Sequence, residues 1–220
     1  ATLSVLSSRA DMVSDGSAVV QVTVPQGATI DNVQVKLGDT SVTNQFKRIN
    51  ETTFLGTVSG LVSGPNTIVA SNGATNSSLT LTNWSKNGPI ISGPHQAPWI
   101  CQTHQFSLPD GSTLGAATDA NCNAPTKVLY LYMPTAGLPF KVLPSTTDLP
   151  SDIKKITTTE NKEVNYIVRL ETGTVNRAIY QFATLFDPAK DAVPNPGGSF
   201  SAWNRKLFYS FGGGAGSGYV

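Results

Sequence analysis

The residues best suited to chemistry are three consecutive glycines late in the sequence. They are Gly212, Gly213 and Gly214, and they follow an apolar run that reaches Phe211. Because glycine has no Cβ, its backbone can adopt positive φ and approach another group closely. Successive N–H groups in such a turn form a concave site for an anion. We therefore expect this turn to bind negative charge through the backbone alone.

The groups that would complete a nucleophilic site are not found beside these glycines. The sequence contains no Gly-x-Ser-x-Gly motif. Ser217 follows the turn, but spacing places no histidine or acid next to it, and a serine nucleophile needs a base. His95 and His104 are the two histidines and lie far upstream. We interpret both as surface or loop-packing residues, with a lid or substrate contact as the alternative.

The two cysteines, Cys101 and Cys122, bracket a loop-like stretch of sequence. A disulfide closing this loop is the favoured interpretation, because it would stabilise the fold by about 3 kcal/mol in the chain-entropy model. The alternative is a metal site that also uses His104. It is disfavoured because no second pair of cysteines or histidines lies nearby. We predict no metal and no cofactor.

Two charged residues, Arg169 and Glu171, are expected on one face of a strand, because they are two positions apart. The favoured role is a buried structural ion pair, either with partners outside this chain or with Arg177 across a hairpin. Catalytic use is the alternative. The three tryptophans are far apart in the sequence and are interpreted as packing anchors at domain edges: Trp84, Trp99 and Trp203.

Composition narrows the class of protein. Charged residues make up 13% of the 220 residues, about half the usual share, and the formal net charge is +1. Without a basic cluster, a nucleic-acid partner is not expected. No run approaches the ~18 apolar residues of a membrane span. The low charge, the cysteine pair and a start at Ala1 without Met predict a secreted or periplasmic product after removal of an export signal.

The elements that would position the glycines fall into three regions. Residues 1–84 show short alternating apolar runs separated by turn signals, which is typical of a β-sandwich of immunoglobulin type. Residues 85–160 are rich in proline, and one strand is predicted there at 127–132. In 161–220, strands at 166–171 and 176–185 should form a hairpin around Thr172-Gly173-Thr174. A third strand, buried on both faces, is predicted at 203–211.

A hairpin, a buried strand and a glycine turn together resemble the opening of an α/β-hydrolase sheet. Lipases and esterases often carry His-Gly-Gly-Gly there, and this chain has Phe in place of the His. The order of segments is similar to a largely uncharacterised family of secreted bacterial proteins, in which an immunoglobulin-like domain precedes a body distantly similar to tannases and feruloyl esterases. The segments that carry the resemblance are Leu6–Asp11, Ser92–Pro94, Pro98–Cys101, Asn121–Thr126, Ile167–Gly173, Asn176–Arg177 and Trp203–Gly214.

This resemblance implies ester hydrolysis, in which attack on the carbonyl creates a transient oxyanion. Backbone N–H groups held ~3 Å away stabilise that oxyanion. The donors implied are Gly213 and Gly214, with Ala215 as a weaker candidate. In such enzymes the nucleophile, acid and histidine follow the oxyanion loop along the chain. They would come from a second polypeptide or a cleaved C-terminal remainder, giving a processed heterodimer that acts on small-molecule or polymeric esters.

Two other hypotheses compete with this one. The chain could be a non-catalytic exported module for adhesion, polymer binding or assembly, which explains the missing catalytic set but leaves the glycine turn without a purpose. It could also be a truncated, inactive piece of the same hydrolase. The physical reason to favour a larger body is that three strands without covering elements would leave an apolar face in water.

Overall fold

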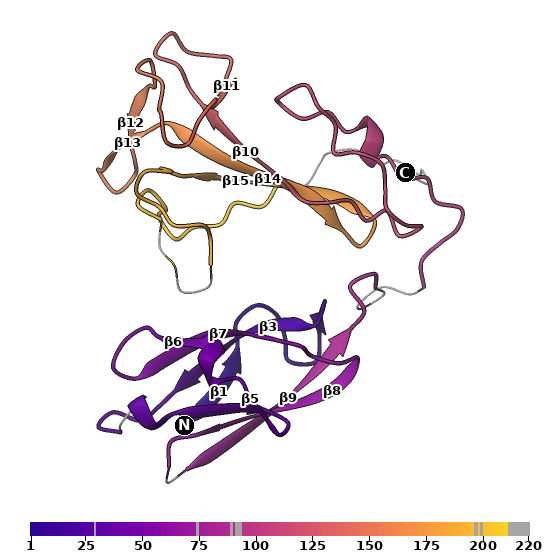
Figure 1. The fold of residues 1–220 in the computed structure, drawn as a ribbon, viewed down its shortest axis with the longest axis vertical. Coiled ribbons are helices and arrows are strands. Elements are labelled where there is room, and N and C mark those ends of the chain that lie inside the picture. The colour runs from indigo at the N-terminus through magenta and orange to yellow at the C-terminus, as the bar shows by residue number, and fades with distance from the viewer. Residues whose placement is uncertain are drawn as a thin grey trace. The chain divides into compact units, whose positions relative to one another are not determined.

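A computed structural model describes residues 1–28, 30–73, 75–88, 90, 94–195, 198 and 200–210. The chain divides into two compact units, the first built from Ala1–His95 and the second from Gln96–Pro194 with residues from 198 onward (Figure 1). Helix is limited, among the described residues, to three short 3₁₀ turns: η1 (Ile30–Asn32), η2 (Thr43–Gln45) and η3 (Thr103–Gln105). No described helix is long and apolar enough to cross a membrane.

The first unit consists of two sheets packed on each other. One has the order β1-β3-β7-β6 and is antiparallel throughout. The other has the order β2-β9-β8-β4-β5, in which only the β2–β9 pair is parallel. The strand bounds are β1 (Thr2–Val5), β2 (Val13–Ser14), β3 (Ser17–Thr23), β4 (Gln34–Leu37), β5 (Thr40–Ser41), β6 (Phe46–Arg48), β7 (Thr53–Ser59), β8 (Gly64–Ser71) and β9 (Asn76–Trp84).

Alternation along these strands explains why the sheets face each other. In β3, Val20 and Val22 are fully buried, while Gln21 and Thr23 lie on the other face. The opposite sheet contributes buried side chains from β4, β8 and β9 to the same cluster, namely Val35, Ile68 and Leu81. The two-sheet arrangement therefore follows from the period of two in the sequence. Its immunoglobulin type stays a prediction.

The second unit contains one four-stranded antiparallel sheet of order β11-β10-β14-β15 and a separate two-stranded ribbon, β12-β13. The bounds are β10 (Lys127–Tyr132), β11 (Lys141–Val142), β12 (Lys155–Thr157), β13 (Glu163–Asn165), β14 (Ile167–Val175) and β15 (Ala178–Leu185). The strand predicted at 127–132 is confirmed as β10. The expectation that these strands open an α/β-hydrolase sheet stays a prediction.

The predicted hairpin is confirmed, but its turn lies elsewhere. β14 runs through Gly173 to Val175, and the turn consists of Asn176 and Arg177, whose φ angles are 46° and 70°. Two consecutive positive φ angles are the signature of the two-residue turn that matches the twist of antiparallel strands. The turn predicted at Thr172-Gly173-Thr174 was wrong, because this glycine is required for packing within the strand.

The third strand predicted at 203–211 is also wrong for the part that the structure describes. Residues 203–210 belong to no strand, and Leu207, Phe208 and Tyr209 are 73%, 90% and 70% exposed. An apolar run becomes a strand only when a neighbouring backbone offers it a ladder of hydrogen bonds, and no described strand does so here.

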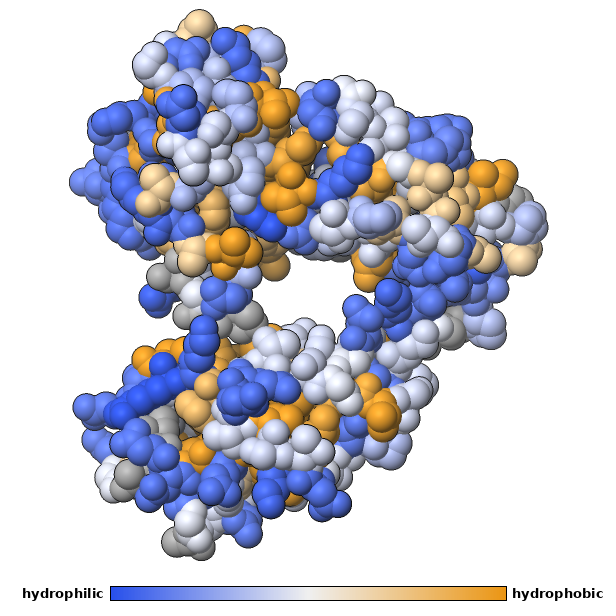
Figure 2. All heavy atoms as spheres, in the orientation of Figure 1, coloured by the Kyte–Doolittle hydropathy of each residue, from blue (hydrophilic) through white to orange (hydrophobic). Residues whose placement is uncertain are grey.

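Figure 2 shows hydrophilic residues over much of the visible surface, with smaller apolar patches between them.

Candidate functional site

The predicted anion-binding turn lies outside the described residues. Gly213, Gly214, Ala215 and Ser217 all fall in 211–220, so the structure describes the chain only as far as Ser210. What it does describe is the sheet and the loop that lead toward this turn. The candidate site is therefore built from the β14–β15 hairpin and from the connection that follows β15.

A half-buried ion pair lies on one face of the hairpin. Arg169 Nη1 donates to Glu171 Oε2 at 2.9 Å, and their side chains are 9% and 30% exposed. The two residues lie two positions apart on β14 and pair with each other. Of the two expected partners, Arg177 across the hairpin was wrong, and a partner outside this chain stays a prediction. Arg177 instead donates from Nη1 to the Gln96 carbonyl at 2.7 Å, and its guanidinium lies 5.6 Å from the centre of the Trp99 ring.

A tyrosine completes this cluster from the neighbouring strand. Tyr180 Oη donates to Glu171 Oε1 at 3.0 Å. Burial is the main cause that raises the pKa of Tyr180 above its ordinary value, a hydrogen bond with Thr126 opposes this, and Glu171 adds to it. The phenol therefore remains a hydrogen-bond donor to the carboxylate at neutral pH. Glu171 is held between a cation and a neutral donor, which fixes its orientation.

Gly173 makes room for this tyrosine. The two residues lie directly opposite each other in the β14–β15 register. A Cβ on Gly173 would lie 2.7 Å from Tyr180 Oη and 2.8 Å from its Cε1. The Tyr180 ring therefore packs directly on the backbone of Gly173. A residue with a side chain at position 173 would clash with the ring and displace the Tyr180 hydroxyl.

One donor of this cluster has no acceptor. Arg169 is 8% exposed, and its Nε is buried without a hydrogen-bond partner among the described residues. Leaving a buried donor unpaired costs about 1–3 kcal/mol and more when the group is charged. Such groups are uncommon in folded proteins and call for a specific explanation. The hairpin is therefore suited to receive an acceptor from outside the described residues.

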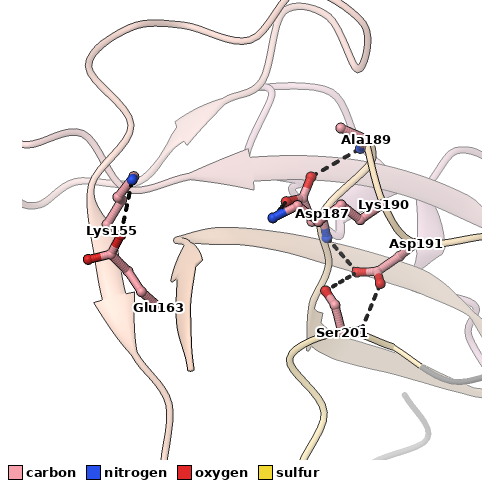
Figure 3. Close-up of polar contacts among 7 residues, drawn as sticks. All are labelled: Lys155, Glu163, Asp187, Ala189, Lys190, Asp191 and Ser201. Carbon is pink, nitrogen blue, oxygen red and sulfur yellow. Dashed lines mark hydrogen bonds and ion pairs between the residues drawn. The ribbon is translucent and has the colours of Figure 1, made fainter. Parts of the chain in front are cut away.

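A second polar cluster follows β15 and closes the proline- and glycine-rich loop (Figure 3). Asp191 accepts hydrogen bonds from Asp187 N at 2.7 Å, from Ser201 N at 2.7 Å and from Ser201 Oγ at 3.2 Å. Asp187 accepts from Ala189 N at 3.0 Å and lies 3.4 Å from Lys190 Nζ. One carboxylate thus joins the two ends of the loop. The sequence analysis did not predict this clamp. Asp187 and Asp191, close together on either side of Pro188, were the sequence signal that could have indicated it.

The same clamp is not a catalytic pair. Ser201 and Asp191 are in contact, but activation of a serine requires a base that accepts its proton and is oriented by a third group. His104 lies on η3 with its Nε2 3.2 Å from the side-chain amide of Gln105. Asp191 therefore serves to close a loop. Figure 3 also shows Lys155 and Glu163, an exposed pair 3.0 Å apart on β12 and β13 that contributes little to stability.

A row of aromatic side chains links the sheet to the loop. Tyr130 of β10 lies 5.5 Å from Phe186, Phe186 lies 6.0 Å from Phe200, and Phe200 lies 6.4 Å from Trp203, measured between ring centres. The segment after residue 200 is thus held by aromatic packing and by the Asp191 clamp. Trp203 is 43% exposed, and its predicted role as a packing anchor stays a prediction.

The predicted disulfide is confirmed. Cys101 and Cys122 are joined with an S–S distance of 2.01 Å. Because both sulfurs are used, the alternative metal site with His104 was wrong, and no group of three or more potential ligands is found within the described ranges. The loop is also tied to the sheet: Ala124 N donates to Thr174 Oγ1 at 3.0 Å, and Lys127 Nζ donates to the Thr113 carbonyl at 2.6 Å.

Comparison with known proteins gives one finding. Residues 3–220 match the description "Tannase-like family of unknown function (DUF6351)". The match spans both units of the chain and includes Gly212, Gly213 and Gly214. None of the curated proteins matches the chain.

Proposed function

The chain belongs to this tannase-like family, and on that premise we propose that it is the N-terminal part of a secreted, serine-type carboxylic-ester hydrolase. The match over residues 3–220 is the observation that carries the proposal, because tannases are ester hydrolases. In this proposal the first unit is an immunoglobulin-like sandwich, and the second unit supplies the opening strands of an α/β-hydrolase sheet.

The chemistry assigned to this chain is stabilisation of the oxyanion. Attack on an ester carbonyl places negative charge on its oxygen, and the backbone N–H groups of Gly213 and Gly214, with Ala215 as a weaker candidate, would donate to it. A donor of this kind lowers the barrier by about 3–4 kcal/mol in a water-poor site. The serine nucleophile, the acid and the histidine would come from a second polypeptide or a cleaved C-terminal remainder. The substrate would be a small-molecule or polymeric ester.

The described structure supports this proposal by the way it holds the approach to the turn. The Asp191 clamp and the aromatic row restrain the chain at residues 200–203, and the exposed residues 207–209 lie between this point and the glycines. An oxyanion site needs such restraint, because its donors act only when they are held in place before the reaction. The disulfide fits an oxidising compartment and so supports secretion.

The test is turnover of p-nitrophenyl esters by the native assembly and by residues 1–220 alone. The assembly should hydrolyse them and the isolated chain should not. Gly213→Pro removes one backbone N–H, whereas Gly213→Ala keeps it, so the alanine variant is the matched control. Proline should lower kcat by about 100- to 1,000-fold relative to alanine. Equal activity of the two variants would remove Gly213 from the donors, and an inactive native assembly would end the hydrolase proposal.

The sandwich favours one alternative, a non-catalytic exported binding or assembly module. Its core is closed by its own two sheets and needs nothing further to be buried. The intact mass of the native preparation under denaturing, non-reducing conditions separates the two functions. A stoichiometric second chain, or a longer chain that contains these residues, supports the hydrolase. A lone 23.2 kDa species that unfolds cooperatively supports the module.

A further inference from the structure

Among the described residues, the backbone groups along the outer edge of β15 have no backbone hydrogen-bond partners. β15 is the last strand in the order β11-β10-β14-β15 and pairs only with β14 within the described residues. Every other long strand of this sheet has neighbours on both sides: β10 lies between β11 and β14, and β14 lies between β10 and β15. The sheet therefore ends in the two-residue strand β11 on one side and in the eight-residue strand β15 on the other.

The hairpin register identifies which backbone groups are open. Val175 pairs with Ala178 across the two-residue turn, which makes theirs a hydrogen-bonded pair. Hydrogen-bonded and non-hydrogen-bonded pairs alternate along an antiparallel ladder, so the amides of Tyr180 and Phe182 face β14. The amides of Ile179, Gln181 and Ala183 face away from it. No hydrogen bond of these three outward-facing backbones is found in the described structure.

Nothing along this edge prevents another strand from pairing with it. Proteins protect exposed edges with lysine, proline, bulges or very short strands. β15 has eight residues, no proline and no charged side chain, and its register with β14 is continuous from Val168↔Leu185 to Val175↔Ala178. Its central aromatic residue, Phe182, is 49% exposed. β15 thus lacks the protective features of an edge strand, and its composition is that of a strand with neighbours on both sides.

The chain's own exposed apolar segment, residues 207–209, does not fill this edge. Residues 207–209 belong to the same unit, but they are exposed and form no strand. The unpaired Nε of Arg169 is an independent sign that something is missing on this hairpin, because that buried donor also lacks an acceptor among the described residues. A row of open backbone groups along a strand favours a partner polypeptide over a small ligand.

We propose that β15 pairs through this edge with a β-strand of the polypeptide that completes the enzyme. The inference rests on the proposed function for the identity of that polypeptide, which is the second chain or the C-terminal remainder. The partner is an extended, uncharged segment. Its backbone bonds to Ile179, Gln181 and Ala183, and it places an apolar side chain next to Phe182.

The test is residue-resolved amide hydrogen exchange on the isolated chain and on the native assembly. In the isolated chain, Ile179, Gln181 and Ala183 should exchange fast, and Tyr180, Phe182 and Thr184 slowly. In the native assembly the first three should slow by about a hundredfold or more, to the rates of their neighbours. Fast exchange at these three amides in the native assembly would overturn the proposal. So would slow exchange in the isolated chain that depends on protein concentration, because a second copy would then be the partner.

A proline at the edge tests the same contact through assembly. Gln181→Pro removes an N–H that makes no bond within the chain, and proline is tolerated at such edge positions. Gln181→Thr keeps the N–H and is the matched control. The proline variant should keep slow exchange at Tyr180 and Thr184 but bind its partner at least about tenfold more weakly than the threonine variant. Equal binding of the two variants contradicts the proposal. If proline unfolds the hairpin, the exchange comparison on the unmodified protein decides alone.

The outcomes separate this inference from the proposed function. An assembly that hydrolyses esters while these amides stay in fast exchange would leave the hydrolase standing and remove the strand pairing. An assembly in which the amides are protected, but which turns over no ester, would keep the pairing and remove the hydrolase.

Discussion

The two units bury their apolar residues in different ways. In the first unit, side chains from two facing sheets form one cluster whose central members, such as Val22, Ile68 and Leu81, have no exposed surface. In the second unit, the corresponding cluster has three buried members, Tyr132, Leu143 and Ile167, and it combines residues of one sheet with residues from loops beside that sheet. The comparison teaches that a sheet closes its core only when a second layer covers it. The first unit contains its second layer, and the second unit does not within the described residues.

The largest expected difference between the units concerns one fully buried isoleucine in each. Ile68→Ala should lower the free energy of unfolding of the first unit by about 4 kcal/mol, because the surrounding side chains of both sheets cannot collapse into the cavity. Ile167→Ala removes the same atoms from a residue that is equally buried. It should cost about 2 kcal/mol, because its partly exposed neighbours can move or admit water. Denaturant unfolding followed by amide signals of each unit measures both. Equal losses would refute the contrast between closed and open cores.

The disulfide should matter to the second unit alone. Replacing Cys101 and Cys122 with serine should destabilise that unit by about 3 kcal/mol, because the unfolded chain regains the freedom of the closed loop. The first unit contains neither cysteine, so its unfolding free energy should be unchanged. Adding a thiol reductant to the unmodified protein is the control and should reproduce the result. A loss of stability in the first unit would show that the two units are energetically coupled.

A glycine covered by an aromatic ring occurs in both units, and the two sites should respond differently to alanine. A Cβ on Gly56 would lie 2.5 Å from the backbone oxygen of Gln45, which cannot move away. The three atoms nearest to a Cβ on Gly173 all belong to the side chain of Tyr180. Gly56→Ala should therefore cost about 3 kcal/mol and Gly173→Ala about 1–2 kcal/mol.

A double-mutant cycle checks the cause at the second site. With Tyr180→Ala already in place, Gly173→Ala should be nearly neutral, since the group that it would meet is gone. If Gly173→Ala remains equally destabilising in that background, then backbone effects, and not the tyrosine ring, require glycine at this position.

The smallest effect is expected in alkali. The pKa of Tyr180 is raised above its ordinary value of 10.0, mainly by burial and further by Glu171. The folded state therefore holds this proton more tightly than the unfolded state. The corresponding stability is fully present below pH 10 and is lost as pH rises through the folded-state pKa. Tyr180→Phe should abolish this part of the pH dependence in the second unit and leave the first unit unchanged. Ultraviolet titration of the phenol measures the pKa directly, and an unshifted value would contradict the assigned burial.

The sequence was a good guide wherever structure depended on neighbours along the chain. The alternation at Val20 and Val22 predicted the face of β3, and the hairpin of β14 and β15 followed from two apolar runs close together. The disulfide followed from two cysteines and a loop. The turn of the hairpin was misplaced because glycine is the commoner turn residue, whereas here Asn176 and Arg177 take the positive φ angles and Gly173 accommodates a ring.

What the sequence by itself determined is the local conformation, since the period of two, the turn residues and the cysteine pair act over short stretches of chain. Only the tertiary structure decided which backbones meet. It left residues 203–210 without a ladder despite their strand-like composition, and it paired Arg169 with Glu171 in place of a residue across the hairpin. It also joined Asp191 to Ser201. Hydrogen bonds and ion pairs depend on a partner at about 3 Å, and only the folded chain determines which residue that partner is.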